Sequence, residues 1–137
     1  MLKTLIISAF LLMHHSLYAD TVFIDKLYEK GHYETALAEY EKYVTTSRLT
    51  EAVKKYKGDS KVQSYSNAIY MLAVNFFYGK GVEKNRKKAI CLLYESALYG
   101  NVNSIHGLNE FYSNAMNPLK NSKKAETFRK VIDGLKD

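Results

Sequence analysis

The stretch from Ala68 to Gly100 constrains the fold of this chain more than any other part of its sequence. Apolar residues recur at helical spacing up to Gly79 and again after Asn85, and a Gly-Lys-Gly-Val segment separates the two runs. Glycine adopts positive φ at little cost, so the chain can turn sharply at Gly79 and Gly81. Asn85 is placed to cap the second helix, and Gly100 is placed to end it. The stretch therefore predicts two helices packed as an antiparallel hairpin.

Each expected helix carries an apolar stripe. The spacing predicts a first helix over residues 62–78 and a second over residues 85–98. The stripes consist of Tyr65, Ile69, Leu72 and Phe76 in the first helix and Ala89, Leu92, Leu93 and Ala97 in the second. A single hairpin cannot cover both of its apolar faces, so neighbouring hairpins have to cover the remainder.

The same pattern returns after a shift of 36 residues. Leu72 then aligns with Leu108 and Asn85 with Asn121, while Lys-Lys-Ala at 87–89 aligns with the same three letters at 123–125. Self-similarity at a fixed period of about 20–50 residues indicates a repeat array. The second copy has lost both turn glycines and is more polar, which is typical of a capping repeat.

This pattern resembles the Sel1-like repeat, a relative of the tetratricopeptide repeat with a longer turn. The residues that carry the resemblance are Leu72, Ala73, Phe76, Gly79, Gly81, Val82, Asn85, Lys88, Ala89, Tyr94, Ala97 and Gly100. Ala73 stands where the family often has glycine, and Leu93 where it often has tryptophan. The resemblance implies an all-α fold, an α/α solenoid of short antiparallel helical hairpins. Residues 61–100 would be an intact copy and residues 101–137 a degenerate capping copy.

Residues 20–60 are expected to form another hairpin followed by a short helix. The segment 27–43, with Gly31, Tyr33, Ala36 and Tyr40, resembles half of a tetratricopeptide unit. The short helix is expected within residues 45–61, with Ser47 or Thr50 as its cap and the Gly-Asp-Ser segment at 58–60 as its end.

The N-terminus has the pattern of a secretory signal. Lys3 precedes the apolar run 5–13, which is too short to span a bilayer, and Ala19 offers a small residue for cleavage. Two departures are the histidines at 14–15 and Leu17. We expect residues 1–19 to be removed after Ala19 and the protein to be periplasmic or secreted. An uncleaved membrane anchor and a cytoplasmic chain with an apolar first helix are the alternatives.

The sequence carries no motif for catalysis, a metal or a cofactor. It lacks His-Glu-x-x-His, Cys-x-x-Cys, a phosphate loop and Gly-x-Ser-x-Gly. Outside the predicted signal, His32 and His106 are isolated and are expected at the surface. The lone cysteine, Cys91, lies between two aliphatic residues and is expected to be a buried, unreactive thiol. We therefore expect no catalytic site, no metal site and no cofactor.

Positive charge is the remaining compositional signal. The formal net charge is +6, and lysines cluster at 54–61, 84–88 and 120–124. An exported protein rarely meets nucleic acid, so nucleic-acid binding is not expected. Weak contact with an anionic envelope surface fits the charge better.

The resemblance implies a binding module rather than an enzyme. We expect an exported helical-repeat adaptor that holds a protein or peptide on its concave side, mainly through the first helix of each hairpin. The aromatic residues Phe77, Tyr78, Tyr99 and Tyr112 are expected mainly in the core, and a place along part of that concave side is the alternative. Helix phase gives these candidate contacts: Asn67, Tyr70, Met71, Asn75, Tyr78, Asn103, His106, Glu110 and Asn114.

Two other functions stay open. One is an enzyme of the cysteine-rich, β-lactamase-like Sel1 type, although the paired cysteines of those proteins are missing here. The other is a secreted factor that acts on another cell. The oligomeric state and the identity of the partner are not determined by the sequence.

Overall fold

The computed structural model describes residue 24 and residues 26–136, so the predicted signal at residues 1–19 lies outside the described part of the chain. All regular structure within this part is helical, and no strand occurs in it. The all-α prediction is therefore confirmed. Across the same residues, no helix combines the length and the apolar character needed to cross a bilayer.

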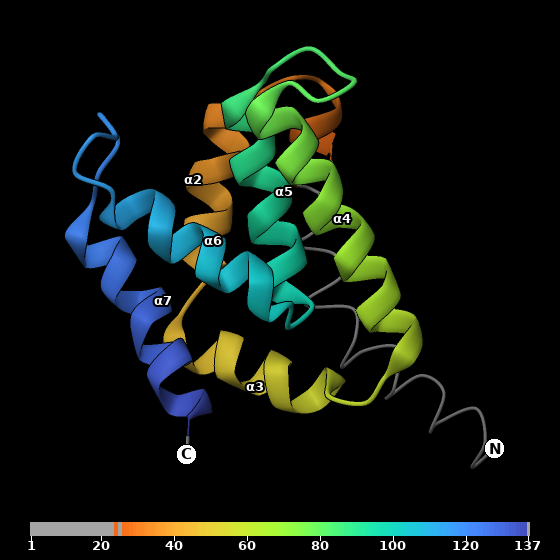
Figure 1. Cartoon of the computed structure of the whole chain (residues 1–137), viewed down its shortest axis with the longest axis vertical. Coiled ribbons are helices and arrows are strands. Elements are labelled where there is room, and N and C mark those ends of the chain that lie inside the picture. Colours follow the sequence, from red (N-terminus) through yellow and green to blue (C-terminus); the bar gives the residue numbers. More distant parts are fainter. Residues whose placement is uncertain (1–23, 25, 137) are drawn as a thin grey trace, which may run out of the picture.

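The helices follow the predicted ranges closely (Figure 1). Ile24 and residues 26–29 are helical, and a tight turn at residues 30–32 leads into the first labelled helix. The labelled helices are α2 (Tyr33–Tyr43), α3 (Thr46–Tyr56), α4 (Ser60–Tyr78), α5 (Arg86–Leu98), α6 (Val102–Ser113) and α7 (Ser122–Leu135).

A polar side chain caps the start of each helix from α3 to α7. The caps are Thr45, Asp59, Asn85, Asn101 and Asn121, and each accepts a hydrogen bond from a backbone N–H three residues later. The prediction of Asn85 is confirmed. The prediction of Ser47 or Thr50 for α3 is wrong, because α3 starts earlier than expected and the hydroxyl of Thr50 donates to the Thr46 carbonyl instead.

Helix α5 is the centre of the molecule (Figure 1). It packs against α4, α6, α2 and α3. Its buried residues therefore point in several directions, and they include Ala89, Ile90, Leu92, Tyr94 and Ala97. Residues 89–97 are buried except for Glu95, and such burial is typical of a helical segment enclosed on all sides.

Helix α4 lies at one edge of the molecule, and its predicted stripe is only half correct. Ile69 is buried and Phe76 is partly buried against α5. Tyr65 and Leu72 are 52% and 42% exposed. They stay partly exposed because Ser66, Ile69 and Ala73 form the face that meets α5. The ring of Tyr65 contacts that of Tyr99 edge to face, with centroids 5.3 Å apart.

The turns after α4 and after α6 are closed by equivalent hydrogen bonds. The Asn85 N–H donates to the carbonyl of Phe76 at 2.8 Å, and the Asn121 N–H donates to the carbonyl of Tyr112 at 3.0 Å. Both asparagines cap the following helix with the same extended backbone conformation. The two turns are 36 residues apart, as the sequence alignment places them.

A lysine stacks on an aromatic ring in each of these turns. The Lys88 ammonium lies 4.2 Å from the ring centroid of Phe76, and that of Lys124 lies 5.3 Å from the ring centroid of Tyr112. Both distances are within the range of a cation–π contact. The aligned residues thus make the same type of contact in both hairpins.

The second turn replaces glycine with side-chain hydrogen bonds. No residue other than glycine has positive φ among the described residues, so the turn at 115–121 takes a different path from the one at 79–85. The Asn117 amide donates to the Phe111 carbonyl at 2.6 Å, and its oxygen accepts from the Leu119 N–H at 3.0 Å. These two bonds hold the loop that follows α6.

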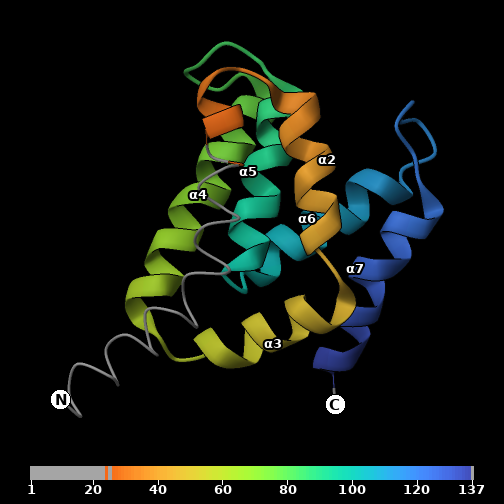
Figure 2. The ribbon, with the colours of Figure 1, turned by 180° about the vertical axis from the view of Figure 1, so that it is seen from behind.

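Helices α2 and α3 of the first half of the chain contact α7. Helix α3 packs on α7, and Figure 2 shows the two helices side by side at the lower end of the molecule, below α5 and α6. The Thr46 hydroxyl donates to the Thr127 carbonyl at 3.3 Å. The Lys124 ammonium forms an ion pair with the half-buried carboxylate of Glu41 in α2.

Helix α3 also comes very close to the end of α5, and Gly100 makes this approach possible. Gly100 has a φ of 77°, and a Cβ atom at this position would lie 2.6 Å from the carbonyl oxygen of Ala52. Only glycine fits both the backbone conformation and the available space.

Candidate functional site

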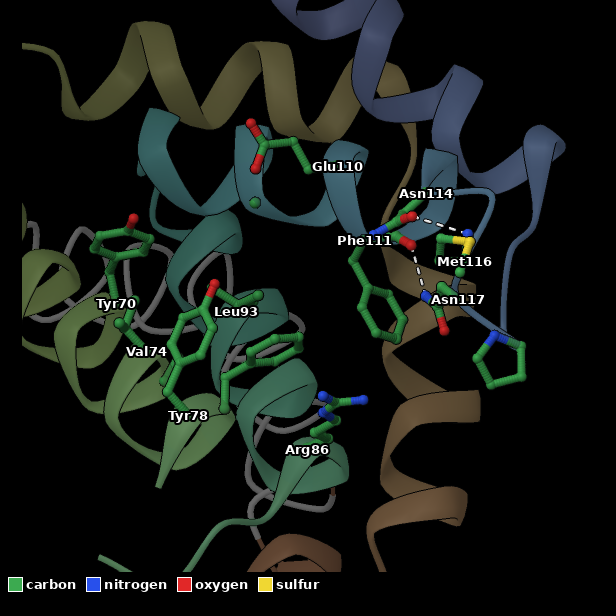
Figure 3. Close-up of a pocket in the computed structure, with 14 residues that line it drawn as sticks. Tyr70, Val74, Tyr78, Arg86, Leu93, Glu110, Phe111, Asn114, Met116 and Asn117 are labelled. Atoms are coloured by element: carbon green, nitrogen blue, oxygen red, sulfur yellow. Dashed lines mark hydrogen bonds between the residues drawn. The ribbon is translucent and has the colours of Figure 1, made fainter. Parts of the chain in front are cut away.

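A groove with a volume of about 470 Å³ opens where α4, α5 and α6 meet. Tyr70, Val74 and Tyr78 line it from α4, and Phe111 and Asn114 line it from α6 (Figure 3). The loop after α6 closes one side through residues 116–118. The volume is within the range of roughly 300–1,000 Å³ that is usual for sites that hold small ligands.

Apolar and aromatic side chains form the floor of the groove. The rings of Phe77 and Phe111 contact each other edge to face, with centroids 6.2 Å apart. Phe77 also contacts Tyr78 edge to face, at 5.0 Å. Ala73 and Leu93 complete the floor. Rings that hold one another in this way form a rigid surface, which reduces the entropy lost when a ligand binds.

Gly107 keeps the groove open. It lies inside α6, where glycine is less favourable than alanine by about 1 kcal/mol. A Cβ atom there would make ordinary contacts with the Leu93 methyl groups, at 3.7 and 3.8 Å. Packing therefore tolerates a small side chain at this position, but a large one would extend into the groove.

Two cations stack on rings that line the groove. The Arg86 guanidinium lies 5.1 Å from the ring centroid of Phe77, and the Lys80 ammonium lies 5.4 Å from that of Tyr78. Figure 3 shows Arg86 at one end of the groove and Glu110 at the other. The two ends of the groove therefore carry opposite charges.

A second, more polar hollow of about 590 Å³ lies between the end of α3, the start of α4, the start of α6 and the end of α7. Asn101 connects its walls. The Asn101 amide donates to the side-chain oxygen of Asn67 at 2.7 Å and to the Ser66 hydroxyl at 3.2 Å. Its own side-chain oxygen caps α6.

Buried serines extend this network. The Ser96 hydroxyl donates to the Ser66 carbonyl at 2.8 Å, and the Ser104 hydroxyl donates to the Ser96 hydroxyl at 2.7 Å. These bonds join α4, α5 and α6 at one level. The network satisfies its own polar groups, so we assign it to structure rather than to ligand binding.

The structure divides the nine sequence-predicted contacts into three groups. Tyr70, Tyr78, Glu110 and Asn114 line the groove. Asn67 and Asn103 line the second hollow, where the oxygen of Asn67 is already bonded to Asn101. Met71, Asn75 and His106 line neither. The residues of the first group come together where α4, α5 and α6 meet.

Sequence reasoning omitted several residues of the groove from its candidate contacts. Phe77 was expected mainly in the core and alternatively on the concave side, and it is partly buried while lining the groove with Tyr78. Tyr99 lines the second hollow, whereas Tyr112 is buried. The groove residues that were not predicted as contacts are Ala73, Val74, Arg86, Leu93, Gly107, Phe111 and residues 116–118, of which Ala73 and Leu93 were expected only as part of the repeat pattern. A glycine within an otherwise regular helix is the signal that could have indicated Gly107.

Titratable groups in the core are shielded from water. Burial raises the pKa of the Cys91 thiol to about 12, and the thiol lies 3.6 Å from the Tyr33 carbonyl. Burial also raises the pKa of Tyr94 and, to about 12, that of Tyr112, whose hydroxyl is 2.9 Å from the Tyr94 hydroxyl. These groups stay protonated at neutral pH and belong to the core.

The described residues contain no group of three or more His, Cys, Asp or Glu side chains arranged to hold a metal ion. Comparisons of the chain with protein-family models, curated proteins and solved structures each gave no match. The groove is therefore interpreted from its own geometry and chemistry.

Proposed function

We propose that this protein is an exported binding module of the Sel1-like repeat type, which holds a protein or peptide in the groove between α4 and α6. The observation that carries the proposal is the groove itself. It joins the first helices of the two repeated hairpins, and a rigid floor of Phe77 and Phe111 lines it. Aromatic residues are favoured anchors at protein interfaces.

The repeat assignment draws support from the two equivalent turns. Asn85 and Asn121 close and cap their hairpins in the same way, and Lys88 and Lys124 stack on aligned rings. Shared geometry at a shift of 36 residues favours two copies of one unit. On this proposal the hairpins form a short α/α solenoid, and residues 101–137 are its last copy.

Obstruction of the groove tests the proposal. Gly107→Met places a large side chain over the floor from a position where packing tolerates the added Cβ atom. His106→Met introduces the same side chain at the adjacent, exposed position outside the groove. The tagged protein and both variants would be purified from the native envelope, and bound proteins would be quantified by mass spectrometry.

We expect Gly107→Met to lose the specific partner and His106→Met to keep it, with both variants folded by circular dichroism. Retention of the partner by Gly107→Met would reject the groove as the binding surface. The enzymatic alternative has its own assay, since hydrolysis of nitrocefin by the purified protein would show a β-lactamase-like activity.

A further inference from the structure

The positive charge of Arg86 at one end of the groove indicates which chemical group of a ligand binds there. Among the described residues, no ion pair includes Arg86, Lys80 or Glu110. Of the neighbouring cations, Lys87 pairs with Glu34, and Lys88 contacts the ring of Phe76, which does not line the groove. Arg86 and Lys80 are thus the cations of the lysine-rich turn that contact groove-lining rings.

The contact with the Phe77 ring leaves the guanidinium of Arg86 able to bind an anion. A guanidinium that lies over an aromatic ring uses its face for the ring and keeps the N–H donors along its edge available. A carboxylate accepts two parallel hydrogen bonds from such an edge. The contact with Phe77 also restricts the arginine side chain, so less conformational entropy is lost when the anion binds.

The apolar floor begins next to this charge. Phe77, the ring under Arg86, also contacts Phe111 across the groove. A ligand that satisfies both features needs an apolar or aromatic group and a carboxylate side by side. Glu110 at the far end repels a second anion, which gives the ligand one preferred orientation (Figure 3).

We propose that the groove binds a peptide through an aromatic or aliphatic side chain with a carboxylate beside it, and that the carboxylate is bound by Arg86. This inference rests on the proposed binding function and specifies its ligand. The carboxylate belongs either to the C-terminus of the peptide or to an Asp or Glu next to the apolar residue. Both present the same chemistry to the guanidinium.

Four synthetic peptides distinguish the contribution of the carboxylate from that of the apolar side chain. The first, Ser-Gly-Ser-Gly-Phe, has a free C-terminal carboxylate, and the second is the same peptide with an amidated C-terminus. The third, amidated Ser-Gly-Ser-Asp-Phe, moves the carboxylate to a side chain. The fourth replaces Phe with Gly in the free-acid peptide. Each would be titrated to millimolar concentration into the ¹⁵N-labelled protein, with backbone amide shifts as the readout.

We expect at least one of the Phe peptides with a carboxylate to shift the amides of residues 74–78 and 107–111 and to bind about tenfold more tightly than the amidated Phe peptide. The one that binds identifies the source of the carboxylate. The Gly peptide should bind more weakly than its Phe counterpart, because it lacks the side chain that fills the floor.

Two matched variants test whether Arg86 binds the carboxylate of the peptide. Arg86→Gln should weaken the carboxylate peptides about tenfold and leave the amidated Phe peptide unchanged. Lys87→Gln removes the same charge from the adjacent residue, whose ammonium pairs with Glu34, and should change neither. Equal binding of acid and amide, equal losses in both variants, or no shift at millimolar peptide would overturn the inference. Partner loss in Gly107→Met alone would then still support the groove as a binding site.

Discussion

Gly81 has a φ of 72° in the turn between α4 and α5, and the space around its Cβ position is open. A substitution there is therefore strained by the backbone alone and not by contacts. The left-handed conformation costs an L-residue roughly 1–2 kcal/mol, and a β-branched side chain is the least suited to it. A substitution at Gly81 therefore measures the free-energy cost of the positive φ angle at this one position.

We predict that Gly81→Val lowers the free energy of unfolding by about 1 kcal/mol or more. Gly81→Asn should cost less, because asparagine tolerates the left-handed region. Urea unfolding followed by circular dichroism gives both values. If Val is tolerated as well as Asn, the positive φ of Gly81 is wrong.

Residues whose roles depend on local backbone geometry were predictable from the sequence. Gly79, Gly81, Asn85 and Gly100 were assigned correctly because turn and cap preferences depend on a few neighbouring residues. Arg86 was not predicted as a groove residue, since the direction of a long, flexible side chain depends on the ring beneath it. The sequence shows that position 86 is an arginine, but it does not show which ring this side chain contacts.

At the scale of the helices, Asn85 and Asn121 make a matched pair. Each caps its helix through a hydrogen bond of 3.0 Å to the backbone N–H of a lysine. We predict that Asn85→Ala and Asn121→Ala each lower the free energy of unfolding by about 1 kcal/mol. Thermal and urea denaturation measure both. A loss confined to one variant would contradict the equivalence of the two turns.

Leu72 and Leu108 occupy aligned positions in very different surroundings. Leu72 is 42% exposed, whereas Leu108 is 0% exposed. We predict that Leu108→Ala costs about 2–5 kcal/mol, because it leaves a cavity in the core, and that Leu72→Ala costs less than about 1 kcal/mol. Equal losses in urea unfolding would show that the exposed side of α4 is covered in the protein.

The contrast between these leucines explains which part of the fold could not be predicted. Helical periodicity identifies an apolar stripe, but it does not tell whether a neighbour covers that stripe. The sequence pattern suggested that the last copy would have the exposed face, yet α6 is enclosed between α5 and α7 while α4 lies at the edge. The groove depends on this packing, so only its residues on α4 and α6 could be predicted from helix phase.

At the scale of the whole molecule, three buried groups that lose a proton at high pH make the free energy of unfolding depend on pH in the alkaline range. Cys91, Tyr94 and Tyr112 have pKa values in the folded protein above their ordinary values of 9.0, 10.0 and 10.0, because burial disfavours the charged form. Above those ordinary values the unfolded chain releases these protons and the folded chain keeps them. The stabilisation is therefore complete below about pH 9 and is lost as the pH rises toward 12.

We predict that the free energy of unfolding falls between about pH 9 and pH 11, by up to about 1.4 kcal/mol per pH unit for each group that is ionised only in the unfolded chain. Urea titrations at fixed pH measure the slope. Tyr94→Phe should reduce it, because phenylalanine has no proton to release. A free energy that rises over this pH range would contradict the burial of these groups.

The contact of α3 with α7 also has a consequence for synthesis of the chain. The hydrogen bond from Thr46 to Thr127 connects residues 81 positions apart, whereas an open repeat array depends on near neighbours. Contacts of large sequence separation slow folding, and the last helix leaves the ribosome after all the others. The core around α6 and α3 therefore stays incomplete until α7 has been synthesised. On the proposal that this protein is exported, late completion of the core favours passage through a secretion channel, because such a channel takes up chains that have not yet folded.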